Sequence, residues 1–292
     1  MQPPKSMRIE RKDAKATQFY AVLFTVLPVL CGLGLIWVDG VIAKVGMLAC
    51  AAFAYQSIRA NLGFSRTIER VDDRVLVHPL WTNKVQTLQG LTEVVIQLAI
   101  PRGVKPARFV ADHFTLRFPE GPVLVQTSAY PDAKELVASL LQEVCGDVAF
   151  PLELGESAMQ HWTGSPEGPS LGVAASYRHV NGTLVTIYVY GARDIPKGLV
   201  DEELASSLAA FKLLCQKKQV PHEVTEPSKT MMGGLEFLTA SMAAGAGARA
   251  IKSQLLLTKW QRRLLKVRVA DAPKGEITGA EATLKAFLAA NS

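Results

Sequence analysis

The longest uninterrupted apolar stretch of the chain lies close to its N-terminus. Residues 19–38 contain no charged side chain, and aromatic residues stand at both ends of the stretch. A helix needs about 20 apolar residues to cross the hydrocarbon core of a bilayer. A weaker stretch follows at residues 41–58, interrupted by Lys44 and rich in small residues that allow helices to pack closely. The pattern predicts a transmembrane helical hairpin over residues 19–58.

Two other structures compete with a membrane hairpin at this position. A cleaved signal peptide has a shorter apolar core and a small-residue cleavage site, whereas a second apolar stretch follows here. A helical hairpin buried inside a soluble domain also fits the pattern and stays open as an alternative.

Basic residues on both sides of the stretch predict its orientation. Cytoplasmic flanks of membrane helices are enriched in Lys and Arg. The basic segment 1–18 precedes the first predicted span, and further arginines follow the second. Both termini are therefore expected in the cytoplasm of a bacterium, with two spans in the inner membrane. The basic residues expected beside the headgroups are Lys12, Lys15, Arg59 and Arg66.

Beyond the apolar region the hydrophobic pattern changes to a period of two. Strand candidates lie at 74–80, 84–88 and 93–99, followed by a hairpin of 109–118 with 123–127. An amphipathic helix is predicted to begin near Pro131 and to end at Cys145, because its apolar residues recur every three or four positions. The order predicts a small β domain over residues 66–150 that ends in one helix.

This strand order, with the stretch RVLVHPLWTNKVQTLQGLTEVVI at 74–96, resembles the bacterial pleckstrin-homology-like domains found beside transmembrane hairpins. The resemblance covers residues 66–146. It implies a small barrel capped by a helix and used for binding or assembly rather than for catalysis.

A second domain is predicted over residues 172–292, after a linker at 151–171 that is rich in Pro and Gly. Strands at 173–179 and 183–190 flank Asn181-Gly182, a strong hairpin signal. Helices are expected at 199–219 and 279–290, and strands at 222–229, 234–242, 249–258 and 264–270. This order resembles the PsbP/Mog1-type α/β/α sandwich, which implies a binding or assembly factor. The predicted fold class is thus membrane-anchored α+β: a transmembrane hairpin, a PH-like β domain and an α/β sandwich with an antiparallel sheet.

Composition excludes several classes of protein. The 292 residues are 49% hydrophobic and 20% charged, which is enough apolar material for folded cores and excludes a disordered chain. Four cysteines are too few for a disulfide-stapled secreted scaffold. A net charge of +6 is too small a basic excess to indicate a nucleic-acid-binding protein.

The sequence contains no catalytic or cofactor motif that we recognise. The five histidines are His78, His113, His161, His179 and His222, and their spacing matches no metal site. Serine forms no Gly-x-Ser-x-Gly turn, and the glycine-rich segment at 245–248 lacks the pattern of a nucleotide-binding loop. We therefore expect no cofactor, no metal and no catalytic residue.

One segment exceeds the background in charge. Residues 249–268 carry seven basic side chains and no acidic one. Six residues in the second half of this segment are the candidate binding residues: Lys259, Trp260, Arg262, Arg263, Lys266 and Arg268. They are expected on a β-hairpin with an aromatic tip that contacts anionic headgroups or an acidic protein partner. An ordinary solvated sheet face explains the same residues, and nucleic acid is disfavoured because no aromatic stacking platform accompanies the charge.

Three functions remain after this comparison. The first is a non-enzymatic inner-membrane protein whose cytoplasmic domains bind a partner or assemble a membrane complex. The alternative is a membrane protein that binds a lipid or small ligand, and the third is an enzyme whose clustered residues the linear sequence hides.

Overall fold

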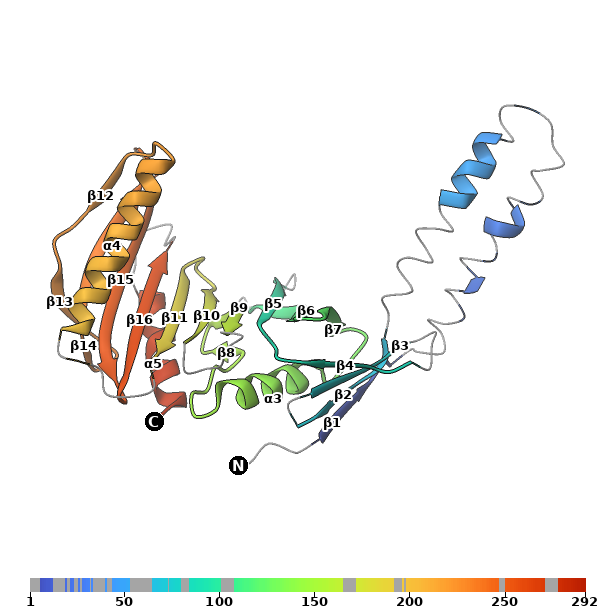
Figure 1. Ribbon diagram of the computed structural model, residues 1–292, viewed down its shortest axis with the longest axis horizontal. Coiled ribbons are helices and arrows are strands. Elements are labelled where there is room, and N and C mark those ends of the chain that lie inside the picture. The colour runs from blue at the N-terminus through green and yellow to red at the C-terminus, as the bar shows by residue number, and fades with distance from the viewer. Residues whose placement is uncertain are drawn as a thin grey trace. The chain divides into compact units, whose positions relative to one another are not determined.

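The structure is a computed structural model (Figure 1). It describes residues 6–12, 19, 22–23, 26, 28–31, 33, 40, 44–52, 65–72, 74–79, 84–100, 108–164, 172–191, 196, 198–246, 250–270 and 278–292. The chain divides into two compact units. Unit 1 comprises Met1–Gly90 with Leu124–Leu136, and unit 2 comprises Leu91–Val123 with Val137–Ser292.

The prediction of a transmembrane hairpin is wrong, because the helices that the structure describes contradict it. None of the helices built from described residues has the length and apolar character that crossing a membrane requires. Much of the segment 19–58, on which this prediction falls, lies outside the described residues. Apolar length in a sequence is necessary for a span, but a span also needs one continuous helix that pairs every backbone group. The expectation of an inner-membrane, two-span protein and the membrane-bound functions fall with it.

Unit 1 contains a four-stranded antiparallel sheet. Its order is β1 (Ser6–Glu10), β2 (Ser65–Val71), β3 (Arg74–Pro79) and β4 (Gln86–Gln89). The N-terminal segment 1–18, expected as a basic cytoplasmic tail, thus contributes an edge strand. Pairing of Ile9 with Ile68, and of Ile68 with Val77, sets three buried side chains in one row of this sheet.

A tyrosine that lies outside the strands joins distant segments of unit 1. The Tyr130 hydroxyl donates a hydrogen bond to the carbonyl oxygen of Ser65, and the backbone N–H of Lys12 donates to the carbonyl oxygen of Ala129 at 2.8 Å. Burial raises the pKa of Tyr130, although the neighbouring Arg11 charge opposes the shift. Residues distant in sequence are therefore joined in one small unit.

The strands expected to close one small PH-like barrel divide between two sheets, so that part of the fold prediction is also wrong. β2, β3 and β4 belong to the four-stranded sheet, whereas β5 (Glu93–Ala99), β6 (Val110–Phe118) and β7 (Gly121–Gln126) belong to a twelve-stranded one. Alternation of apolar residues identifies a strand, but it does not identify the strand that it pairs with.

The large sheet has the path β12-β14-β15-β16-β11-β10-β9-β5-β6-β7, with β13 paired to β14 and β8 paired to β9. The pairings between neighbouring strands of this sheet for which the residue register is established are antiparallel. The further strands are β8 (Glu153–Leu154), β9 (Ser157–Gly164), β10 (Val173–His179), β11 (Leu184–Tyr190), β12 (His222–Val224), β13 (Ser228–Met232), β14 (Leu235–Ala244), β15 (Ile251–Trp260) and β16 (Arg263–Ala270). β8 and β9 lie in the segment 151–171, where the sequence predicts a linker.

Several elements of this unit agree closely with the sequence. The hairpin of β10 and β11 turns at Asn181-Gly182, and Gly182 has the positive φ of 94° that this turn position favours. The helices are α3 (Ala133–Cys145), α4 (Leu199–Lys217) and α5 (Thr278–Ala290). These bounds confirm the predicted helices ending at Cys145 and covering 199–219 and 279–290 to within about two residues at each end.

One face of the large sheet, here named the inner face, is buried along its centre. A single row of side chains crosses seven neighbouring strands, and each of its members is at most 1% exposed: Leu116, Val94, Trp162, Ala175, Ile187, Val267 and Leu256. α5 packs on this face, where the Phe287 ring lies 5.6 Å from the Trp260 ring and 5.4 Å from the Phe150 ring.

The opposite face is covered at one end by α4, which runs along β14, β15 and β16 in Figure 1. Leu204 and Leu208 of the helix pack against Leu255, Leu257 and Leu264 of the sheet. Asp201 and Glu202 in the first turn and Lys217 in the last turn complement the dipole of the helix.

Candidate functional site

The six residues predicted to form one basic binding surface do not share a surface. They lie on β15, β16 and the turn between them, but side chains alternate between the two faces of a sheet. Trp260, expected as an exposed aromatic tip, is only 8% exposed because its ring packs against Phe287 on the inner face. The aromatic residue therefore contributes to the core.

Arg263 is held by an acidic partner within the chain. Its Nη2 lies 2.5 Å from both carboxylate oxygens of Asp147. This hydrogen bond, together with the guanidinium charge, lowers the pKa of the Asp147 carboxyl, although partial burial opposes the shift. Lys259 and Arg262 are exposed beside it. The turn and its immediate surroundings thus serve mainly to attach the hairpin to the rest of unit 2.

Lys266 lies on the other face of β16, under α4. Its Nζ donates to Oε1 of Glu203 at 2.9 Å and to the Ser207 hydroxyl at 2.7 Å, and the Tyr190 hydroxyl donates to the same glutamate oxygen at 3.1 Å. Burial alone would raise the pKa of Glu203, but the hydrogen bond and charge of Lys266 outweigh it and lower the pKa. Burial and the same carboxylate raise the pKa of Tyr190.

The residues predicted beside a membrane are only partly described. Lys12 and Arg66 are exposed in unit 1, one just after β1 and the other on β2. Lys15 and Arg59 lie outside the described residues.

Next to α4, the second face of the large sheet is partly accessible over six strands, β16, β11, β10, β9, β5 and β6, although α4 covers Lys266 on β16. We name it the uncovered face and define it by two rows of paired residues. One row is Lys266, Tyr188, Ala174, Thr163, Glu93 and Arg117, and the next is Arg268, Thr186, Ser176, His161, Val95 and Thr115. All except Ala174 are exposed or half-buried. The strands that bury every residue of the inner-face row therefore present polar groups on the opposite side.

The uncovered face carries more positive than negative charge. Glu93 accepts from His161 Nε2 at 2.7 Å through one oxygen and from Arg117 Nε at 2.9 Å through the other. Arg268 is exposed and makes no ion pair within the described part of the chain. In the adjoining row, the Nε of Arg178 donates to a neutral partner, the Gln160 amide oxygen, at 3.1 Å.

Hydroxyl groups occupy the centre of the uncovered face. The hydroxyls of Ser176 and Thr186 lie 2.9 Å apart on neighbouring strands, with Thr115 and Thr163 on the strands beyond. The Lys266 ammonium stands 5.6 Å from the centre of the Tyr188 ring. Together with the guanidinium groups, these side chains supply hydrogen-bond donors that match carboxylate or phosphate oxygens.

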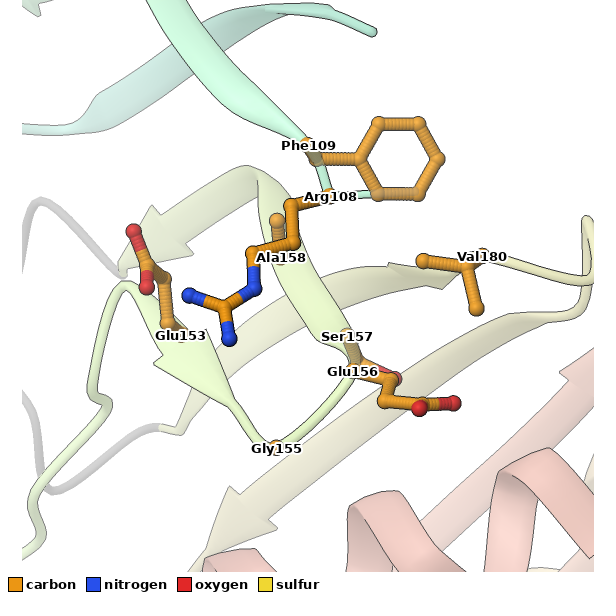
Figure 2. A pocket seen from close by; sticks show the side chains of 8 residues that line it. All are labelled: Arg108, Phe109, Glu153, Gly155, Glu156, Ser157, Ala158 and Val180. Carbon is orange, nitrogen blue, oxygen red and sulfur yellow. The ribbon is translucent and has the colours of Figure 1, made fainter. Parts of the chain in front are cut away.

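A separate depression, here named the hollow, lies at one end of these strands and has a volume of about 360 Å³. Its lining comes from the two residues just before β6, the β8–β9 hairpin and the β10–β11 turn: Arg108, Phe109, Glu153, Gly155, Glu156, Ser157, Ala158 and Val180. Figure 2 shows the Arg108 side chain extending toward the β8–β9 hairpin, which carries both glutamates. Its volume is at the lower end of the range for small-molecule sites.

No group of three or more His, Cys, Asp or Glu side chains able to hold a metal occurs among the described residues. Cys145 is buried, and burial raises the pKa of its thiol to about 12, although a hydrogen bond with Trp162 opposes the shift; it is therefore not a thiolate nucleophile. Ser157 is buried as well, and its hydroxyl lies 2.6 Å from that of Thr283, which donates to the Gly279 carbonyl oxygen.

The uncovered face was not predicted, although the sequence contains a trace of it. Four of its strands carry a Ser or Thr where the alternation places a residue opposite the core, as at Thr115 and Ser176. Within one strand such a residue is indistinguishable from an ordinary solvated position. Only the register, which places Ser176 opposite both Thr186 and His161, reveals a continuous surface.

Comparison with protein-family models and with curated proteins yields no match to this chain. The resemblances to PH-like and PsbP/Mog1-type domains therefore stay predictions, and the function has to be inferred from the geometry alone.

Proposed function

We propose that this chain is a binding protein whose uncovered face recognises an extended acidic segment of a partner protein. The observation that carries the proposal is the contrast between the two faces of the same six strands. The inner face packs a row that is at most 1% exposed, whereas the uncovered face presents accessible hydroxyl and basic groups.

The charge of the face favours an acidic partner. In the two rows that define the face, Arg117, Lys266 and Arg268 supply three positive charges and Glu93 supplies one negative charge. Glu203 of α4 neutralises Lys266, which leaves a surplus of one positive charge. Glu93 and Glu203 are each engaged by these cations or by His161, so no free carboxylate of theirs opposes an incoming anion. Such complementarity governs specificity and the rate of association more than total affinity.

The dimensions of the face favour an extended segment over a globular partner. Six strands spaced about 4.8 Å apart give a width of roughly 24 Å, and its two rows are about 7 Å apart along the strands. That area is well below the roughly 800 Å² that each partner buries in a standard protein–protein interface. An extended peptide crossing the strands contacts one row along its whole length.

The test uses the full chain and a fluorescein-labelled peptide of about twelve residues that alternates Glu and Ser, with binding followed by fluorescence anisotropy. Arg268→Glu is expected to weaken binding at least fivefold, because it reverses an exposed charge at the β16 end of the proposed site. Arg262→Glu makes the same change of net charge at the β15–β16 turn and is expected to change binding less than twofold. Higher salt should weaken the wild-type interaction.

Three outcomes contradict the proposal: no binding of the peptide, equal loss of affinity in the two variants, or equally tight binding of a Lys-Ser peptide. Vesicles containing anionic phospholipid are measured in parallel. Vesicle binding that depends on Arg268, without peptide binding, would replace the acidic segment by a lipid surface and overturn the proposal.

A further inference from the structure

The hollow has a mixed chemistry that the uncovered face does not share. Arg108 is exposed on its rim and makes no ion pair within the described residues, so its guanidinium is available to a ligand. Glu153 and Glu156 lie on the β8–β9 hairpin toward which Arg108 extends in Figure 2. Phe109, Ala158 and Val180 supply apolar wall between these charges.

His179 lies beside the carboxylate of Glu156 at one side of the hollow. The backbone N–H of Asn181 donates to His179 Nδ1 at 3.2 Å, which places the proton of the neutral ring on Nε2. That nitrogen lies 3.5 Å from Oε2 of Glu156. The histidine is itself confined, because the Gly279 backbone approaches so closely that a Cβ there would lie 2.9 Å from the ring. Glu156 lies within reach of this ring and is accessible to a ligand, with its side chain 67% exposed.

We propose that the hollow binds a small zwitterion, an α-amino acid with an aliphatic side chain. Its carboxylate pairs with Arg108, its ammonium group pairs with Glu156, and its side chain contacts Phe109 and Val180. A simple anion would lie beside two carboxylates, and a simple cation would face the guanidinium. A zwitterion satisfies both signs of charge, and the small volume of the hollow suits a molecule of this size.

The ligand series that tests this site separates the two charges. Binding of leucine, of leucinamide, which lacks the carboxylate, and of 4-methylpentanoate, which lacks the ammonium group, is measured by titration calorimetry on the full chain. Leucine is expected to bind at least tenfold more tightly than either analogue, because each analogue leaves one protein charge without its partner. Absence of leucine binding, or an analogue that binds as tightly as leucine, would overturn the proposal.

Substitutions of residues that line the hollow test whether leucine binds there. Arg108→Gln and Glu156→Gln are each expected to weaken leucine binding about tenfold, and far-ultraviolet circular dichroism checks that each variant stays folded. Glu120→Gln, at an exposed position in the β6–β7 turn, is the matched control and should leave binding unchanged. Leucine binding that survives in both hollow variants would contradict the assignment. The result is independent of the acidic-peptide experiment, because Arg268 is not among the residues that line the hollow.

Discussion

At the scale of single residues, the clearest difference is between side chains of one type in different surroundings. Arg263 and Arg262 are neighbours in sequence, yet Arg263 forms an ion pair with Asp147 whereas Arg262 is exposed in a turn. Lys266 is only 18% exposed and is matched by Glu203, whereas Arg268, two positions later on the same side of β16, is exposed and unmatched among the described residues. Local charge density therefore does not define a binding surface, because intramolecular partners neutralise part of it.

The Glu203–Lys266 pair gives a pH-dependent contribution to stability. Because the pKa of Glu203 is lowered in the folded protein, its contribution is fully present above the ordinary pKa of 4.5 and is lost as the pH falls through the folded value. Glu203→Gln is expected to lower the free energy of unfolding at pH 7 by about 1–2 kcal/mol. Urea unfolding of the wild type and the variant at pH 7, 5, 4 and 3 measures both effects.

The difference between the two proteins should shrink as the pH falls below about 4.5. Glu236→Gln, which alters an exposed ion pair with Lys229, is the matched control and should change stability by less than about 0.5 kcal/mol. A Glu203→Gln effect that is the same at pH 7 and pH 3 would show that the carboxylate charge is not responsible.

At the scale of elements, the sequence patterns locate helices and strands but not their partners. α4 follows from its apolar stripe at Leu204, Leu208 and Cys215 and from its terminal charges. The β10–β11 hairpin follows from Asn181-Gly182, since this pair favours a two-residue turn. β8 and β9 were missed because the prolines and glycines around them are typical of connecting segments.

Two residues in the turn of the β15–β16 hairpin have strained backbone conformations, and a substitution can relieve this strain. Gln261 and Arg262 connect the paired residues Trp260 and Arg263, and both have positive φ, 47° and 64°. Glycine is preferred at such positions because it lacks the Cβ that clashes there. Arg262→Gly is expected to raise the free energy of unfolding by about 0.5–1 kcal/mol in chemical denaturation. Lys259→Gly in the strand beside it should instead lower stability, and a loss of stability in both variants would contradict this explanation.

At the scale of the whole molecule, the large sheet joins segments that the sequence assigns to different regions. β9 pairs with β5 on one side and with β10 on the other. α5 is attached to the same region by two contacts: Ser157 lies 2.6 Å from Thr283, and Asn291 donates to the Ala149 carbonyl oxygen at 2.9 Å. The Asp147–Arg263 pair adds a third link. Residues 172–292 are therefore only part of this sheet unit.

This continuity predicts how fragments of the protein behave. The isolated segment 172–292 loses the β9 partner of β10, the α5 contacts and Asp147, and leaves an unpaired central strand as an edge. We expect it to unfold at a lower urea concentration than the segment 91–292, or to aggregate. Equal midpoints and equally sharp transitions would show that 172–292 is a complete domain. Analytical ultracentrifugation distinguishes aggregation from simple loss of stability.

The sequence by itself determined the local elements, because their signals are local. Periodicity gave α3, α4 and α5, a turn dipeptide gave the β10–β11 hairpin, and alternation gave β3, β5, β6 and β16. It also indicated an apolar N-terminal region, but apolar composition does not establish a continuous spanning helix, and none is found among the described residues.

Only the tertiary structure decided which strands pair and which residues share a face. Trp260 is a core residue because the strand register directs its ring toward Phe287. Arg263 attaches the hairpin to the rest of the unit because Asp147 lies beside it. The uncovered face and the hollow arise from side chains that meet across strands, as Ser176 and His161 do. Such juxtapositions depend on long-range register and chain path, which hydrophobic patterning within one strand does not encode.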